Sequence, residues 1–304
     1  MSSPLVTILL PVYNGEKTIK TTIESLLNQT FTNFELLLGI DGTTDASKNI
    51  ALAFNDSRIR VIEHPQNLGL ANNLNAIIRH ASSNSHYFAM AEQDDIYVPE
   101  RLEWQVEVMN KYADVGLVSG IAEFKSDNKV LQFPGILVNN RQFPQGEELF
   151  KYLYVNQLKV VNTCMMWRKY IHAEHDLIFN NTYGNFNVDW DFVLRFSLLS
   201  KIHGISKKLV TMNRLEQRDS VTQQKHEQYN ASRNLLKDFH ATFPNIVSKK
   251  LYQKALNMHR KIEIGNNPKY KIVLKSIAYY LMTFDRFYID YLFKKVKFYT
   301  KSRS

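Results

Sequence analysis

Residues 6–45 read VTILLPVYNGEKTIKTTIESLLNQTFTNFELLLGIDGTTD and contain two apolar runs separated by a helical pattern. Residues 5–11 and 34–40 are almost continuously apolar, which is typical of parallel strands that are buried on both faces. Residues 18–29 favour a helix between them. Because parallel strands need a crossover connection, this segment predicts a strand, a helix and a second, parallel strand.

The alternation of strand and helix patterns continues beyond this segment. Further strand patterns lie at residues 58–63, 86–91 and 116–124, and further helical patterns at residues 45–55, 69–80 and 104–112. A turn-rich stretch follows at residues 126–148, and the pattern is helical from about residue 214 to the end. The sequence therefore predicts an α/β fold, a mixed, mostly parallel sheet flanked by helices, with a helical C-terminal extension.

Composition limits the class of protein. A chain of 304 residues with 44% apolar and 12% aromatic side chains can bury a large core. Cys164 is the one cysteine, which excludes an internal disulfide framework and fits a reducing, cytoplasmic setting. The first apolar run has no basic segment before it and is interrupted by prolines, so it predicts a strand and not a signal peptide.

Polar residues follow each of the first four predicted strands. They are the segments YNGE at 13–16, DGTTD at 41–45, HPQNLG at 64–69 and EQDD at 92–95. In open sheets of this type, ligands bind outside the carboxyl ends of the strands. We therefore expect the four segments to border one crevice.

The fourth segment belongs to AEQDDIYVPERLEWQ, residues 91–105, and carries three carboxylates, Glu92, Asp94 and Asp95. Unpaired, the three charges would repel one another, whereas a divalent cation removes that cost, and oxygen-only ligands suit Mg²⁺ or Mn²⁺. The alternative is that Asp94 and Asp95 cap the helix that begins near Pro99 or lie in solvent. Their position beside three other polar strand ends favours the cation site.

Several ordered segments together resemble glycosyltransferase family 2, of the bacterial surface-polysaccharide type, whose members have the GT-A nucleotide-sugar-binding fold. Residues 6–45 are similar to the family's opening strand, its Pro-x-Tyr-Asn turn and its Asp-Gly-Ser/Thr-x-x-Asp segment. NLGLANNLNAII is similar to its Asn-x-Gly-Leu segment, EQDDIYVPERLEWQ to its DxD metal motif with the following Pro-x-Arg-Leu, and NVDWDFVLRFS to its Glu-Asp motif. The resemblance covers about residues 5–222.

The resemblance implies roles on the nucleotide-sugar side of the site. Asp41 matches a residue that accepts a hydrogen bond from uracil N3–H. Asp94 matches the metal ligand of the DxD motif, and Glu92, longer by one methylene than the usual Asp, matches its first position. Mn²⁺ or Mg²⁺ is the implied cofactor. The other residues expected to bind the nucleotide-sugar are Pro11, Tyr13, Asn14, Asn67, Gly69, Gln93 and Arg214, together with Glu92.

The acceptor side is expected at the start of a predicted helix at residues 189–201. Asp189 matches the family's general base, which takes the proton of the acceptor hydroxyl in an inverting transfer. Val188 stands where the family usually has Glu, and a helix cap is the alternative role for Asp189. Trp190, beside the base, is expected to stack on the acceptor sugar, with packing in the core or at the rim as the alternative.

Other classes of protein compete with this interpretation. A nucleotidyltransferase also joins an α/β sheet to metal-binding carboxylates, but it should show a Gly-rich, basic loop after the first strand, where PVYNGEK has one Gly and one Lys. A non-catalytic glycan- or nucleotide-binding module stays open, with Asp189 against it. No G-x-G-x-x-G follows a strand, which disfavours a dinucleotide oxidoreductase. His172 and His175 have no third ligand nearby in sequence, which disfavours zinc.

The resemblance thus implies an inverting glycosyltransferase that moves a single hexose or N-acetylhexosamine from a UDP-sugar to a hydroxyl of a surface glycan acceptor. The acceptor would be a glycan or lipid-linked glycan of a capsule, lipopolysaccharide or exopolysaccharide. Residues 1–222 are expected to form the GT-A domain, with a nucleotide-sugar half at 1–120 and an acceptor half at 121–222. Residues 223–304 are expected to form a helical C-terminal region.

The basic charge is concentrated near the C-terminus. From residue 249 onward the chain has 14 Lys/Arg and 3 Asp/Glu. In residues 269–304 the longest charge-free run has nine residues, 276–284, about half of what a spanning helix needs. Aromatic, aliphatic and basic side chains recur there, which predicts peripheral binding to an anionic membrane surface at the cytoplasmic face. Packing on the catalytic domain is the alternative, and no nucleic-acid-binding motif accompanies the charge.

Overall fold

The computed structural model describes residues 5–126, 129–133, 137–138, 141–142, 144–157, 160–213 and 225–301. The chain divides into two compact units. The N-terminal unit comprises residues 1–150 and 158–221, and the C-terminal unit comprises residues 151–157 and 222–304.

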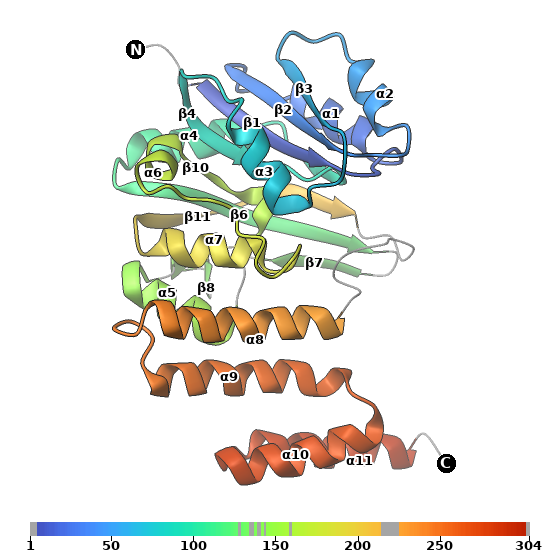
Figure 1. Cartoon of the computed structure of the whole chain (residues 1–304), viewed down its shortest axis with the longest axis vertical. Coiled ribbons are helices and arrows are strands. Elements are labelled where there is room, and N and C mark those ends of the chain that lie inside the picture. Colours follow the sequence, from blue (N-terminus) through green and yellow to red (C-terminus); the bar gives the residue numbers. More distant parts are fainter. Residues whose placement is uncertain are drawn as a thin grey trace. The chain divides into compact units, whose positions relative to one another are not determined.

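A nine-stranded mixed sheet forms the centre of the N-terminal unit (Figure 1). Its strands are β1 (Leu5–Val12), β2 (Phe34–Asp41), β3 (Ile59–His64), β4 (Ser85–Met90), β5 (Asp95–Tyr97), β6 (Val115–Ser126), β7 (Lys129–Phe133), β10 (Met166–Arg168) and β11 (Lys201–Asn213). The strand order is β3-β2-β1-β4-β10-β6-β11-β5, with β7 beside β6. A separate two-stranded sheet joins β8 (Leu137–Val138) to β9 (Arg141–Gln142).

The predicted parallel half of the sheet is confirmed. β1 pairs in parallel with both β2 and β4, and β2 pairs in parallel with β3. β1 and β2 are buried at nearly every position, which explains why their sequences are continuously apolar. β10 returns antiparallel between β4 and β6, and β5 runs antiparallel beside β11. The short strand β5 and the long strand β11 were not identified by the sequence analysis.

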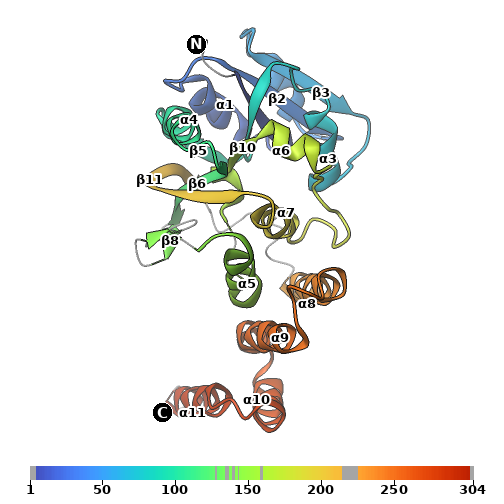
Figure 2. The ribbon, with the colours of Figure 1, turned by 90° about the vertical axis from the view of Figure 1, so that its left-hand side faces the viewer.

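Helices cover both faces of this sheet. They are α1 (Ile19–Leu27), α2 (Ser47–Leu52), α3 (Leu70–Ile78), α4 (Arg101–Lys111), α6 (Lys169–Glu174) and α7 (Val188–Ser197), with a 3₁₀ turn η1 (Asn162–Cys164). The helix α5 (Gly146–Asn156) begins in this unit, and its residues from 151 onward belong to the C-terminal unit. Figure 2 shows α1 and α4 on one face and α3 and α6 on the other. The predicted α/β fold with crossover helices is therefore correct.

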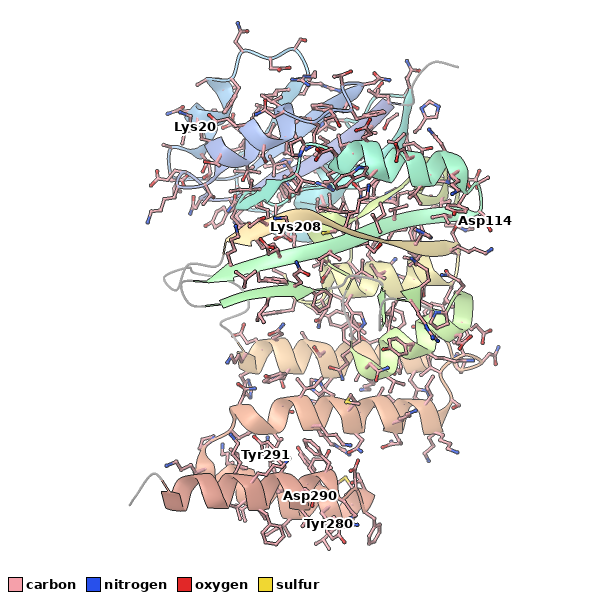
Figure 3. All side chains as sticks on the ribbon, turned by 180° about the vertical axis from the view of Figure 1, so that it is seen from behind. Lys20, Asp114, Lys208, Tyr280, Asp290 and Tyr291 are labelled. Carbon is pink, nitrogen blue, oxygen red and sulfur yellow. The ribbon has the colours of Figure 1, made fainter. Side chains whose placement is uncertain are left out.

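The C-terminal unit is helical, as predicted from the sequence. It contains α8 (Lys225–Thr242), α9 (Lys249–Glu263), η3 (Ile264–Asn266), α10 (Lys269–Thr283) and α11 (Phe287–Lys301), together with the last turns of α5. Tyr154 of α5 donates to the carbonyl of Leu236 on α8 over 2.5 Å. In Figure 3 Tyr291 of α11 points towards α9, and its hydroxyl lies 3.0 Å from where a Cβ on Gly265 would be.

The helix α10 has an exposed apolar stripe. Its members are Tyr270, Leu274, Ile277 and Leu281, which recur at helical spacing and are each 43–64% exposed. Phe284, in a left-handed conformation, ends this helix and separates it from α11. Among the helices described, none is long and apolar enough to cross a membrane.

Candidate active site

The carboxyl ends of β1 to β4 lie along one edge of the sheet. Val12 pairs with Ile40 and Asp41 pairs with His64, so the first three strands end in register. At the end of β4 the N–H of Ala91 donates to Leu9 of β1 over 2.9 Å. Because these strands are parallel, the polar segments that follow them all leave from this edge.

The first two segments are joined through Asn14. Oδ1 of Asn14 accepts from the N–H of Thr44 over 3.0 Å, and the N–H of Asn14 donates to Oγ1 of Thr43 over 3.0 Å. Asn14 has a φ of 48°, a left-handed conformation that Asn tolerates. Asn14 therefore connects the loop after β1 to the loop after β2. Tyr13 beside it is 46% exposed, whereas Pro11 is buried within β1.

Asp45 stabilises the same pair of loops. Its carboxylate accepts from the N–H of Glu16 over 2.9 Å and from the backbone and hydroxyl of Ser47. Burial acts to raise its pKa, but these hydrogen bonds outweigh burial and lower the pKa of Asp45 to about 2. The final Asp of the DGTTD segment thus has a structural role that the sequence analysis did not assign.

Asp41 holds the third segment in place. Its side chain is buried, and its two oxygens accept from the N–H groups of Leu68 at 2.7 Å and Gly69 at 3.0 Å. Asn67 is exposed, and its Oδ1 also accepts from the Gly69 N–H, over 2.9 Å. Each carboxylate oxygen has a second lone pair, so these bonds leave acceptor capacity for a ligand. Gly42, with a φ of 61°, has no room for a Cβ, which would lie 2.4 Å from the Asn67 nitrogen.

The fourth segment brings three carboxylates together. Oxygens of Glu92, Asp94 and Asp95 lie within 4.8 Å of one another, with Asp95 buried and the other two half-buried. Such a set of hard oxygen donors fits Mg²⁺ or Mn²⁺, and a cation offsets the repulsion among the three charges. Within the part of the chain that the structure describes, this is the one group of His, Cys, Asp and Glu side chains placed to hold a metal ion.

Gln93 connects this acidic segment to the first loop. Its Oε1 accepts from the N–H of Tyr13 over 2.8 Å, and its Nε2 donates to the Tyr13 carbonyl over 2.9 Å. The hydroxyl of Thr22 on α1 donates to the Gln93 carbonyl over 2.9 Å. Gln93, which is predicted to bind the nucleotide-sugar, thus also joins two protein loops through its side-chain amide.

Glu92 is positioned by two residues that the sequence analysis did not single out. The N–H of Glu92 donates to the Tyr97 hydroxyl over 2.8 Å, and Nδ2 of Asn162 donates to Oε1 of Glu92 over 3.1 Å. The Tyr97 hydroxyl also bonds to Thr163. Burial, with the nearby charge of Asp95, raises the pKa of Tyr97 well above its usual value, so the hydroxyl stays neutral.

A buried arginine, Arg101, stabilises the same turn. Arg101, from the Pro-x-Arg-Leu sequence, donates from Nη2 to the carbonyls of Met90 at 2.7 Å and Met165 at 3.4 Å. Its guanidinium lies 4.6 Å from the centre of the Tyr97 ring. Burial lowers the pKa of Arg101, although nearby groups oppose the shift. The motif therefore fixes the end of β4, from which the acidic segment begins.

The segment before α7 is tied to the N-terminus of α3. Oδ1 of Asn185 accepts from the N–H of Leu70 over 2.9 Å. Asn75 donates to the Phe179 carbonyl over 2.8 Å and accepts from the Phe179 N–H over 2.9 Å. These bonds bring the chain that leads to Asp189 beside the loop that Asp41 holds. The signal in the sequence was the amide-rich run NNTYGNFN, residues 180–187.

Asp189 and Asp191 lie in the first turn of α7 in different surroundings. Asp191 is buried and paired with Arg195, whose Nε donates to it over 3.0 Å. Burial raises the pKa of Asp191, although Arg195 acts to lower it. Asp189 is half-buried, and Asn187 is the N-cap residue of the helix. Asp191 therefore has the structural role, and Asp189 stays the candidate base.

The structure changes the expected role of Trp190 and places His172 in an aromatic core. Trp190 is 1% exposed, so its ring lies in the protein interior, and the expected stacking on an acceptor sugar is wrong for this conformation. His172 packs against the rings of Phe88, Trp167 and Phe192. Burial lowers its pKa to about 4, which is typical of a neutral core histidine. Arg214 lies outside the described residues.

A family model described as glycosyl transferase family 2 matches residues 7–175, more than half of the chain. The chain belongs to glycosyltransferase family 2. It is 28% identical to an uncharacterized glycosyltransferase of Haemophilus influenzae, over 97% of this chain and 91% of that protein. It is 34% identical to WfgD of Escherichia coli, named UDP-Glc:alpha-D-GlcNAc-diphosphoundecaprenol beta-1,3-glucosyltransferase, over 43% of this chain and 51% of WfgD.

Solved structures of low sequence identity share the GT-A fold of this family 2 glycosyltransferase. Residues 1–349 of S. aureus TarS match with a TM-score of 0.61 at 16% identity, over 98% of this chain and 91% of that one. The mannosyltransferase PcManGT from Pyrobaculum calidifontis, in complex with GDP-Man and Mn²⁺, matches with a TM-score of 0.59 at 12% identity, over 96% and 84%. Membership in this family identifies the chain as a glycosyltransferase and disfavours the two alternatives, a nucleotidyltransferase and a non-catalytic binding module.

Proposed function

We propose that this enzyme is an inverting, metal-dependent glycosyltransferase that moves one hexose or N-acetylhexosamine from a UDP-sugar to a hydroxyl of a surface glycan acceptor. The observation that carries the proposal is the cluster of Glu92, Asp94 and Asp95 at the same sheet edge as Asp41, with Asp189 on a segment tied to that edge. Residues 1–222 would form the catalytic GT-A domain and residues 223–304 the helical region.

The donor side of the proposal rests on the loops after β1, β2 and β4. Asp41 would accept the uracil N3–H through the lone pairs that Leu68 and Gly69 leave free, and exposed Tyr13 would lie against the base. Asp94, with Glu92, would hold Mn²⁺ or Mg²⁺, which when bound neutralises charge on the diphosphate leaving group. S. aureus TarS has been solved with UDP-GlcNAc and with UDP, which supports a UDP-sugar donor.

Asp189 would supply the base. In an inverting transfer the acceptor oxygen attacks the anomeric carbon from the side opposite to the diphosphate and gives its proton to a positioned carboxylate. Asp189 is half-buried, and among the described residues it has no ion-pair partner, whereas Asp191 is paired with Arg195. These surroundings suit the role of a general base. The name of WfgD describes a lipid diphosphate acceptor, which supports a lipid-linked glycan as acceptor here.

The C-terminal unit would hold the enzyme on the cytoplasmic face of an anionic membrane. The exposed stripe of Tyr270, Leu274, Ile277 and Leu281 on α10 would lie in the headgroup region, with the basic residues around it facing anionic lipids. Peripheral binding of this kind would bring the enzyme to a lipid-linked acceptor.

Release of nucleotide from a panel of donors tests the function. The panel contains UDP-glucose, UDP-GlcNAc, UDP-galactose and GDP-mannose, each with and without Mn²⁺. We expect Mn²⁺-dependent release of UDP and a product whose anomeric configuration is inverted. Release from GDP-mannose alone would overturn the choice of nucleotide, and a retained configuration would overturn the inverting mechanism.

A further inference from the structure

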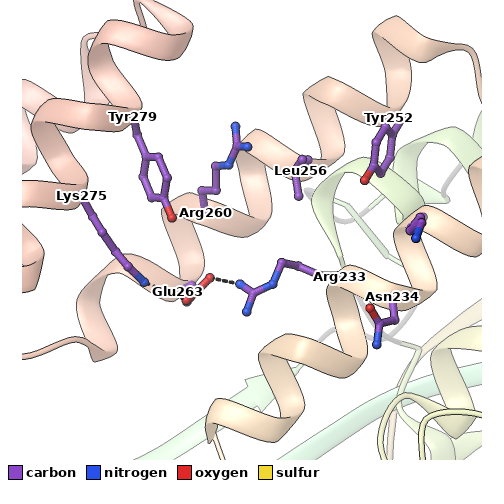
Figure 4. Close-up of a pocket in the computed structure, with 9 residues that line it drawn as sticks. Arg233, Asn234, Tyr252, Leu256, Arg260, Glu263, Lys275 and Tyr279 are labelled. Atoms are coloured by element: carbon purple, nitrogen blue, oxygen red, sulfur yellow. Dashed lines mark hydrogen bonds and ion pairs between the residues drawn. The ribbon is translucent and has the colours of Figure 1, made fainter.

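The C-terminal unit contains a pocket of about 490 Å³ that lies among α8, α9 and α10 (Figure 4). Each helix contributes side chains from one face. Arg233 and Lys237 are one turn apart on α8, and Lys275 and Tyr279 are one turn apart on α10. None of these residues belongs to the candidate active site in the N-terminal unit.

Glu263 is the one carboxylate among the residues that line this pocket, and it is already paired. Arg233 donates to its Oε2, and Nζ of Lys275 lies 3.1 Å from its Oε1 (Figure 4). Burial acts to raise the pKa of Glu263, but Lys275 and Arg233 outweigh burial and lower it. The carboxylate is therefore ionised and its charge is shared between two cations.

Two further cations line the pocket. Lys237 and Arg260 have no carboxylate within ion-pair distance in the described part of the chain, and the Arg260 guanidinium lies 5.2 Å from the centre of the Tyr279 ring. The pocket therefore carries four basic side chains against one carboxylate.

The remaining polar groups of the pocket can each donate a hydrogen bond. The hydroxyls of Tyr252 and Tyr279 and the amide of Asn234 line it beside the cations. A cluster of Arg, Lys and hydroxyl donors with excess positive charge matches the charge and the acceptor oxygens of a phosphate group. Leu256 is the apolar member of the lining.

We propose that this pocket binds the phosphate group of a membrane lipid headgroup or of a lipid-linked acceptor. This inference rests on the proposed function, in which the acceptor is bound to the membrane. It adds a specific phosphate-binding site to the general attraction between basic side chains and anionic lipids. Leu274 of the exposed stripe and Lys275 of the pocket are adjacent in sequence, so they lie about 100° apart around α10. A helix whose stripe lies in the headgroup region keeps Lys275 at the depth of lipid phosphates.

A pair of charge-matched variants tests the site in the full chain. Lys237→Gln with Arg260→Gln removes two cations of the pocket, and Lys250→Gln with Lys254→Gln removes two exposed cations of α9 that do not line it. The probes are inorganic pyrophosphate, measured by calorimetry, and vesicles of equal parts phosphatidylglycerol and phosphatidylcholine, measured by sedimentation. We expect the pocket variant to bind pyrophosphate about tenfold more weakly or worse, and the control to bind it like the unmodified protein.

Competition separates the two sources of phosphate. If pyrophosphate displaces the protein from the vesicles, a lipid headgroup occupies the pocket. If pyrophosphate binds in the pocket without affecting vesicle binding, a lipid headgroup is excluded and the phosphate of the acceptor is the source that the proposal retains. The proposal would be overturned if the pocket variant and the control variant lost affinity for pyrophosphate and for vesicles to the same extent. It would also be overturned if the unmodified protein did not bind pyrophosphate. UDP-sugar hydrolysis without vesicles is measured on the same proteins, and its absence would count against the proposed function and not against the pocket.

Discussion

The side-chain amide of Asn162 donates a hydrogen bond from Nδ2 to Oε1 of Glu92 over 3.1 Å. Asn162 begins η1, the turn that leads into β10, and it is 70 positions from Glu92 in the chain. The bond fixes one oxygen of the acidic segment, while Tyr97 fixes the Glu92 backbone. The orientation of the acidic cluster therefore depends on the return of the chain to the sheet at β10.

Replacing Asn162 tests this dependence. In Asn162→Ala the Glu92 carboxylate loses its donor, so we expect the Mn²⁺ affinity measured by calorimetry in the presence of UDP to fall about 10-fold or more. Asn162→Asp should be worse, because it places another negative charge 3.1 Å from Glu92. Asn156→Ala is the control, because it removes an amide that donates to the Tyr152 carbonyl of its own helix and lies outside the acidic segment. Unchanged Mn²⁺ affinity in Asn162→Ala would contradict a positioning role.

Asp94 is proposed as the main protein ligand of the cation. Asp94→Asn should abolish metal-dependent UDP-sugar turnover and leave the melting temperature unchanged or slightly higher, because it removes one of three clustered charges. Glu92→Gln should be milder, since the amide can still bond to Asn162. Turnover and thermal melting of the two variants check this. Near-normal turnover in Asp94→Asn would refute the metal assignment.

Asp189 is proposed as the general base, and Asp191 is its natural control. Asp189→Asn should lower turnover by about 10²- to 10⁴-fold with UDP-sugar affinity largely kept. Asp191→Asn should instead lower the free energy of unfolding by about 3 kcal/mol, because Arg195 loses its buried partner. Steady-state kinetics and urea unfolding separate the two. Equal loss of donor binding in Asp189→Asn would point to a structural role.

The parallel half of the sheet could be predicted from sequence because burial on both faces requires continuous apolar runs, as in β1 and β2. The strand β5 could not be predicted, because three residues are too few to show a strand pattern. Its position also depends on pairing with β11, more than a hundred residues later in the chain. The boundary of α7 at Val188 was predicted to within one residue, since carboxylates in its first turn are a local signal.

The candidate site shows the same division between local and long-range information. Strand-end polar residues such as Asp41 and Asp94 were visible because parallel topology brings strand ends together. The partners that orient them were not. Asn162 reaches Glu92, and Asn185 reaches Leu70, only once the sheet is complete. The hydrogen bonds between the Gln93 amide and the Tyr13 backbone could not be predicted either, because they join two loops 80 positions apart.

His172 predicts a specific dependence of stability on pH. Its folded pKa is about 4 against an ordinary 6.5, so below pH 6.5 the unfolded chain takes up a proton that the folded chain excludes. Stability is therefore fully present above pH 6.5 and falls as the pH drops towards 4, by at most about 3 kcal/mol from this residue. His172→Phe, which keeps the aromatic packing, should reduce this loss. Urea unfolding at pH 7 and pH 5 measures it, and an unchanged difference between the two pH values would contradict the assignment.

The exposed stripe on α10 gives a test of membrane binding. Deleting residues 269–304 should abolish salt-sensitive sedimentation with phosphatidylglycerol vesicles and leave UDP-sugar hydrolysis intact, because the residues proposed to bind the donor lie in the N-terminal unit. The deletion also removes Lys275 from Glu263, so a finer variant is needed.

Leu274→Gln with Leu281→Gln is that finer variant, since both side chains are 64% exposed and their loss should leave the fold intact. Full burial of a leucine side chain stabilises binding by about 1.5–3 kcal/mol. Even partial insertion of two leucines should therefore contribute about tenfold or more to vesicle binding, and the variant should lose that factor. Leu52→Gln, at an exposed leucine of the N-terminal unit, is the matched control. If the stripe variant bound vesicles as tightly as the control, the stripe would not enter the membrane, and the remaining attraction would come from charge alone.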